Sequence, residues 1–184
     1  MIRTMKKMTH AIVGVFTVSA VLFAAPAMTK AQGNSSLTDP EVAHVAVVAN
    51  RIDISYADIA MKKSKDKEVI QFAETMKRDH TAVIGQAADL AKKLGVTPAD
   101  NAVSRKLLAD ADKTKNMLNG KSGKAFNKAY IDNEVAYHKA VISAVENLLI
   151  PETENAELKQ LLQNVLPALR AHLGHAEMLQ KNYK

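Results

Sequence analysis

The chain has 184 residues, of which 47% are hydrophobic and 24% are charged, and it contains no cysteine and no tryptophan. This length suits one domain, and the lack of cysteine excludes disulfides, zinc-thiolate sites, iron-sulfur clusters and thiol nucleophiles. Few aromatic residues among many Ala, Leu, Val and Lys favour packed amphipathic helices over a sheet.

Residues 1–31 have the pattern of a secretory signal peptide. Three basic residues precede an uncharged apolar stretch over 11–25, and small residues follow it. The stretch of about 15 residues is shorter than the roughly 20 that a spanning helix needs, and no later segment is apolar enough to span a bilayer. We therefore expect the leader to be removed and the protein to be exported, to the periplasm or beyond, with no stable transmembrane segment.

The leader also accounts for most of the net charge of +6. Without the four basic residues of 1–31, the chain keeps 21 basic and 19 acidic residues, a net charge of +2. The remaining basic residues alternate with acidic ones and lack the clustering and stacking aromatics of a nucleic-acid site. We expect no nucleic-acid partner, whereas a protein partner or a homo-oligomer stays open.

Residues 32–37 read as a flexible linker, and residues 38–184 have the pattern of a single helical domain. Its first helix begins at the capping-box pair Thr38 and Glu41. Gly95 and Pro151 are expected to end the second and third helices. Apolar residues at three- and four-residue spacing predict long helices over 38–63, 66–94, 123–149 and 153–182.

Four long amphipathic helices bury their apolar stripes most simply as a four-helix bundle. The stretch between the second and third helices, residues 95–122, is too long for a hairpin loop and carries weaker helical periodicity over 101–118. Such a segment can travel the length of the bundle, as in ferritin-like folds. The sequence thus predicts an all-α, ferritin-like bundle with a helical crossover, with a plain up-down bundle as the alternative.

Three histidines stand out because each lies on the core-facing stripe of a different long helix. His80, His138 and His172 all fall near the middle of their predicted helices. At about 1.5 Å of rise per residue, the three can sit at a similar height in the bundle. We therefore predict that they converge in the interior.

Carboxylates and a fourth histidine accompany this set. Glu134 lies four residues before His138, His175 lies three residues after His172, and Asp53 lies near the middle of the first helix. Imidazole and carboxylate ligands suit iron, manganese, copper or zinc. All six residues are therefore candidate metal ligands. The Glu-x-x-His pairs of di-iron bundles are absent, and a buried polar layer without metal is the structural alternative.

Five segments in order resemble the bacterial domain-of-unknown-function 4142 family, and the resemblance spans residues 41–179. It implies an exported, ferritin-like helical protein without an established activity, of a kind often described as predicted outer-membrane proteins. The family commonly has Glu where this chain has Asp53, which reaches one methylene less far. The segments are FAETMKRDHT (72–81), LAKKLGV (90–96), SGKAFNKAY (122–130), HKAV (138–141) and LPALRAHL (166–173).

Motifs of other enzyme classes are missing. The sequence has no Gly-x-Ser-x-Gly, no phosphate-binding glycine loop, no Rossmann fingerprint and no His-Glu-x-x-His run. Catalysis is therefore not favoured. Two functions stay open: an exported metal-binding bundle with a stress-related role, and a structural or interaction bundle of the periplasm whose histidines form a buried polar layer.

Overall fold

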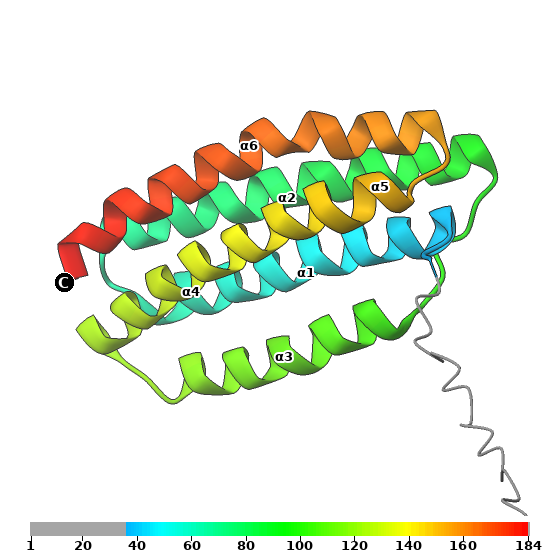
Figure 1. Ribbon diagram of the computed structural model, residues 1–184. Coiled ribbons are helices and arrows are strands. Elements are labelled where there is room, and N and C mark those ends of the chain that lie inside the picture. The colour runs from blue at the N-terminus through cyan, green and yellow to red at the C-terminus, as the bar shows by residue number, and fades with distance from the viewer. Residues whose placement is uncertain (1–35, 184) are drawn as a thin grey trace, which may run out of the picture. The chain divides into compact units, whose positions relative to one another are not determined.

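Four long helices and a shorter crossover helix make up the described part of the chain, residues 36–183 of a computed structural model (Figure 1). Within these residues every regular element is a helix, and none is long and apolar enough to cross a membrane. The expected leader over 1–31 and most of the expected linker over 32–37 lie outside the described residues. The long helices are α1 (Asp39–Lys63), α2 (Lys67–Leu94), α4 (Gly123–Ala144) and α6 (Ala156–Gln180), and the crossover helix is α3 (Ala102–Asn119).

The crossover decides the topology. Helix α3 returns along the outside of the bundle, from the end where α2 finishes to the end where α4 begins (Figure 1). It lies mainly against α1. As a result α2 and α4 run in the same direction, as the ferritin-like prediction requires, and the up-down alternative is wrong.

Short polar contacts fix the ends of the first two helices where the sequence places them. The Glu41 carboxylate accepts the Thr38 backbone N–H at 2.9 Å, as a capping box requires. The Asp66 side chain accepts the Glu68 N–H at 3.0 Å and begins α2. Gly95 ends α2 in the left-handed region with φ 64°, which a residue without Cβ adopts at little cost.

The sequence predicts that the third long helix stops before Pro151. In the structure the helix continues past this residue. Helix α4 continues through a π turn (Val145–Leu149) into a last short turn, α5 (Ile150–Glu152). In the π turn the Ile150 N–H donates to the carbonyl of Val145, five residues back. Because this turn already breaks the usual four-residue ladder, the missing N–H of proline removes little that the helix would otherwise have.

The fourth long helix begins three residues later than predicted. The Thr153 hydroxyl donates to the Leu149 carbonyl and so closes the preceding turn. Asn155 instead caps α6, because its side chain accepts the N–H groups of Glu157 and Leu158 at 2.9 and 3.0 Å. Helix α6 then runs through Pro167 and ends in a 3-10 turn, η2 (Lys181–Tyr183).

The core differs between the two halves of the bundle. The half that holds the end of α1 and the start of α2 is filled by large side chains such as Phe72, Phe126 and Tyr130, all fully buried. The other half has an aliphatic core that includes Val42, Leu149 and Leu162. The two halves meet at the level of the predicted histidines.

One predicted stripe is only partly buried. On α2 the last buried residue is His80, and the following stripe residues are half-buried. They line a cavity, so the prediction of a fully packed core position is wrong for them, although Leu90 also packs against the aliphatic core. These residues are Val83, Ala87, Leu90 and Leu94.

Candidate metal centre

Three imidazole rings meet in the middle of the bundle, one from each of three helices. His80 comes from α2, His138 from α4 and His172 from α6, and all three are buried. The ring centroids are 5.7 Å apart for His80 and His138, 5.4 Å for His80 and His172, and 5.5 Å for His138 and His172. One nitrogen of each ring lies within 4.8 Å of the others. The structure thus brings together the three histidines as the helical spacing predicted.

Two of the rings have a hydrogen-bond acceptor that fixes the tautomer. Nδ1 of His138 lies 3.0 Å from the carbonyl oxygen of Glu134, one turn earlier. Nε2 of His172 lies 3.0 Å from Oδ2 of Asp79, on α2. Both partners only accept, so these nitrogens carry the proton, and Nε2 of His138 and Nδ1 of His172 keep the lone pair.

The tautomer of His80 follows from an amide whose orientation is itself fixed. The Asn50 side-chain N–H donates to the carbonyl of Ala46 at 2.8 Å, so its Oδ1 is the atom that faces the ring. That oxygen lies 2.7 Å from Nδ1 of His80, which must therefore donate. Nε2 of His80 keeps its lone pair. The lone-pair nitrogens of all three histidines are buried and have no hydrogen-bond partner.

Two buried carboxyl groups lie beside the imidazoles. Oδ2 of Asp53, from α1, is 3.5 Å from Nε2 of His80 and 3.8 Å from Nε2 of His138. Oε2 of Glu134 is 3.6 Å from Nδ1 of His138. Both carboxyl groups are fully buried, and none of their four oxygens has a hydrogen-bond partner. With Asp53, all four long helices contribute to the cluster.

Burial dominates the electrostatics of the cluster. It raises the pKa of Asp53 to about 8 and the pKa of Glu134 well above its ordinary value. Burial, with the neighbouring imidazoles, lowers the pKa of His80 to about 3, and burial lowers that of His138 to about 4. At neutral pH the two imidazoles are therefore neutral, with their lone pairs free to bind a cation.

His175 is the predicted ligand that the structure places elsewhere. Its side chain is exposed, and its ring packs edge-on against Phe72 with the centroids 5.1 Å apart. Three residues advance a helix by about 300°, so His175 points about 60° away from His172. That rotation is enough to turn the side chain out of the interior, and the candidate set is reduced to His80, His138, His172, Asp53 and Glu134.

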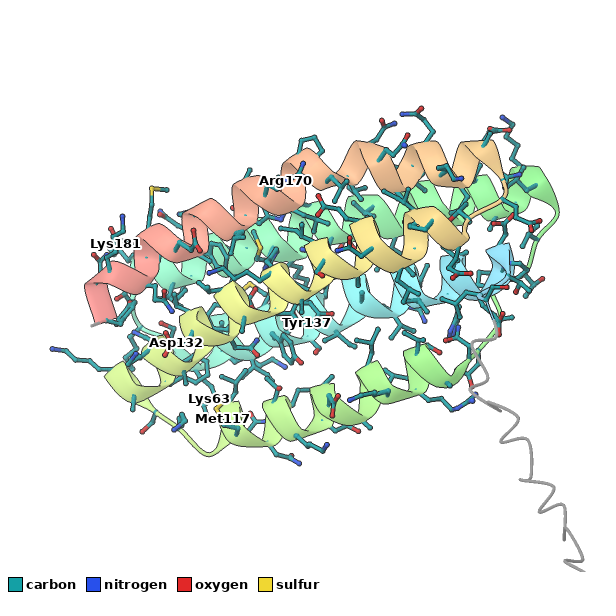
Figure 2. All side chains as sticks on the ribbon, in the orientation of Figure 1. Lys63, Met117, Asp132, Tyr137, Arg170 and Lys181 are labelled. Atoms are coloured by element: carbon teal, nitrogen blue, oxygen red, sulfur yellow. The ribbon has the colours of Figure 1, made fainter. Side chains whose placement is uncertain are left out.

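Two residues that support the candidate ligand histidines were not predicted from the sequence. Asn50, which holds His80, lies three residues before Asp53 on α1, but this spacing alone does not identify it, because the same step turns His175 away from His172. Tyr137 points from α4 to α1 (Figure 2), and its hydroxyl donates to the Ala49 carbonyl at 2.8 Å. Its ring lies edge-on to His138, with centroids 6.4 Å apart, so it braces that ligand.

The donor set fits a first-row transition-metal ion. Three imidazoles and two carboxyl groups are the kind of ligands preferred by copper(II), zinc, iron and manganese. The second nitrogen of each imidazole is already held by Asn50, Asp79 or the Glu134 carbonyl, as is usual for metal-binding histidines. A divalent cation would also balance the charge of two ionised carboxylates. The supporting hydrogen bonds use only the outer nitrogen of each ring and leave the inner nitrogen available to a cation.

Comparison with known proteins supports the fold and gives the family. A solved structure described as "CopM in the Cu(II)-bound form" matches with a TM-score of 0.61 and 17% sequence identity, over 80% of this chain and 100% of that chain. At this identity the likeness concerns the fold alone. The sequence matches no curated protein. The family model of the domain of unknown function DUF4142 matches residues 24–179, which include the whole histidine and carboxylate cluster, and the chain therefore belongs to the DUF4142 family.

Proposed function

We propose that this protein is an exported bundle that binds one transition-metal ion through His80, His138, His172 and Asp53, with Glu134 beside them. The observation that carries the proposal is the set of three buried imidazole nitrogens that hold lone pairs and have no hydrogen-bond partner. They come from three helices and lie together in one group. A cation is the one kind of partner that accepts several lone pairs at once.

A buried polar layer without metal explains these nitrogens less well. In such a layer the neighbouring groups would satisfy each other, because an unsatisfied buried polar atom costs about 1 to 3 kcal/mol. Here each histidine donates outward, away from the cluster, and the inner nitrogen of each ring is left as an acceptor without a partner. Three such atoms in one place favour a bound cation over a purely structural role.

The carboxyl groups add a charge argument. Two buried carboxylates facing one another would be costly without a counter-charge, and burial keeps both protonated in the metal-free protein. A divalent ion supplies that counter-charge. Asp53 is the nearer ligand because its Oδ2 approaches the lone-pair nitrogens of both His80 and His138.

Copper(II) is the first ion to test. The nitrogen and oxygen donors suit a divalent ion better than copper(I), which prefers thiolate and thioether ligands. The solved structure of similar fold is described in a Cu(II)-bound form, which supports the same choice, although zinc, iron and manganese suit the donor set too. Binding, rather than catalysis, is what this donor set supports.

The location and role form the second part of the proposal. The leader pattern of residues 1–31 supports export to the periplasm, and the family resemblance supports association with the outer membrane. A protein that holds a transition metal there would serve the cell under metal or oxidative stress. The intact mass of protein recovered from the periplasm tests the export step, and a mass that still includes residues 1–25 would contradict it.

Calorimetric titration of metal-free mature protein tests the binding. We expect one equivalent of copper(II), zinc, iron(II) or manganese(II) to bind and to raise the melting temperature, because a ligand that binds the native state stabilises it. Elemental analysis of protein purified from its native host without chelators would identify the ion. No heat of binding and no melting shift with any of the four ions would leave the structural polar layer as the better explanation.

A further inference from the structure

A large cavity extends from the histidine cluster into the aliphatic half of the bundle. Its volume is about 580 Å³, and its wall includes residues of α1, α2, α4 and α6, with a few from α3. Along α2 the lining residues extend from Asp79 to Leu94, and along α6 they extend from Leu158 to His172. The cavity is partly open to solvent, and its volume lies within the roughly 300 to 1,000 Å³ that is typical of small-ligand sites.

The sequence explains why this half is hollow. All aromatic side chains that fill the core belong to the other half or to the level of the histidines. Here the lining positions carry small side chains instead, among them Ala46, Ala87, Ala91 and Ala144. Small residues at these positions cannot fill the space between helices held at normal bundle spacing.

Several polar groups in the wall are already engaged with the protein. Asp39 accepts the N–H groups at the start of α6, both at 2.9 Å. Asp110 pairs with two lysines of its own helix at 2.5 and 2.9 Å. Asp79 and Asn50 hold histidines, and the lone-pair nitrogens of those rings are inaccessible. The rest of the wall is almost entirely aliphatic, so the part of a ligand that enters must be apolar.

The shape of the cavity restricts the occupant further. The fifteen-residue step from Asp79 to Leu94 corresponds to a length of about 22 Å along α2. A cavity of this length and volume suits a long, narrow ligand better than a compact one. One hydrocarbon chain, which spans about 15 Å in a membrane leaflet, fits within this length.

We propose that this cavity binds the hydrocarbon chain of a single-chain amphiphile, with the chain lying along α2 and α6 and the head group outside. The chain would cover the part of the half-buried stripe of Val83, Ala87 and Leu90 that the protein leaves exposed. An acyl chain from a fatty acid or from a lipid has the same chemistry here. The histidines form one end of the cavity wall, and the inference does not require a metal ion because it rests on the aliphatic part of that wall.

Binding of linear carboxylates to chelator-treated mature protein tests the inference, with native mass spectrometry for stoichiometry and calorimetry for affinity. Octanoate, dodecanoate and hexadecanoate should bind one per chain, with affinity rising up to about fourfold for each added methylene until the cavity is filled. A repeat of the titration with a lysophospholipid of the same chain length distinguishes a lipid ligand from a free fatty acid. Equal affinity for the lysophospholipid and the fatty acid would show that the chain alone is recognised.

Two neighbouring alanines of α2 provide a matched pair of variants. Ala87 lines the cavity, whereas Ala88 is exposed and does not line it. Ala87→Phe should fill part of the cavity and weaken binding at least tenfold, and Ala88→Phe should leave it unchanged. Ala46→Phe fills the same cavity from α1 and should repeat the loss. Circular dichroism and melting of each variant show that it is folded.

Three results would overturn the inference. One is the absence of saturable binding at every chain length, and another is equal binding by Ala87→Phe and Ala88→Phe proteins that are both folded. The third is a dimer of the wild-type protein that Ala87→Phe disrupts without any chain bound, which would make the surface an interface between copies. A failure of metal binding would leave the result unaffected, because the titration uses metal-free protein.

Discussion

His172 on α6 donates from Nε2 to the carboxylate of Asp79 on α2, and the two atoms are 3.0 Å apart. Asp79 directly precedes His80, so two successive residues of one helix supply both a candidate ligand and the group that orients another. A hydrogen bond with Arg78 holds the pKa of Asp79 below its ordinary value. The carboxylate is therefore ionised and holds the His172 ring with its Nδ1 lone pair toward the interior.

Removal of this orienting carboxylate should weaken metal binding without removing a ligand. We expect Asp79→Ala to lower the affinity for the bound ion by about 10- to 100-fold, since the His172 ring loses the partner that fixes its tautomer. Calorimetric titration measures this change. Asp58→Ala is the matched control, because it removes an exposed carboxylate that pairs with Lys77 at 2.9 Å, away from the cluster. Equal affinities in the two variants would contradict the orienting role.

The candidate ligands should separate from His175 in a melting series. His80→Ala, His138→Ala and His172→Ala should each lose most of the rise in melting temperature that the metal gives to the wild-type protein. His175→Ala should keep that rise, since its ring is exposed and packs against Phe72. If the three inner variants were less stable without metal yet kept the wild-type response to it, the histidines would have a structural role only.

The helical stripes predict most of the fold but only part of the site. Spacing alone identified the helix and the height of His80, His138 and His172, because a periodic pattern defines a face and a rise per residue. Spacing wrongly placed His175 among the inward-facing ligands, whereas the three-residue step from His172 turns its side chain outward. It also could not show that the stripe around Leu90 faces a cavity, because a stripe shows which side points inward but not how much volume lies opposite.

Asp53 should make the metal-free protein less stable as the pH rises. Burial raises its native-state pKa to about 8, against an ordinary value of 3.8, so between these values the native state binds a proton that the unfolded state releases. The stabilising contribution is complete below about pH 4 and is lost up to about pH 8. The maximal slope is about −1.4 kcal/mol per pH unit.

Urea denaturation of wild type and Asp53→Asn at pH 5, 6 and 7 measures this effect, with metal removed by chelation. The variant cannot ionise, so its free energy of unfolding relative to wild type should increase by up to about 3 kcal/mol across the series. Asp58→Asn serves as the exposed control and should show no such trend. The acid loss of stability due to the low pKa of His80 and His138 is common to both proteins and cancels in the difference. A constant difference from pH 5 to 7 would show that Asp53 ionises normally in the native state.

The two halves of the bundle should respond differently to truncation of large side chains. Met76 is fully buried in the aromatic half, so Met76→Ala should lower the free energy of unfolding by about 2 to 5 kcal/mol, through lost burial and a new cavity. Leu90 is half-buried and faces a cavity that already exists, so Leu90→Ala should cost only about 1 kcal/mol or less. Urea denaturation of both variants in delipidated protein provides the comparison. The same Leu90→Ala change should become more costly once a hydrocarbon chain is bound, because the leucine then packs against the chain and loses those contacts on truncation. An equally large cost for the two variants in delipidated protein would mean that the bundle closes over the cavity in solution.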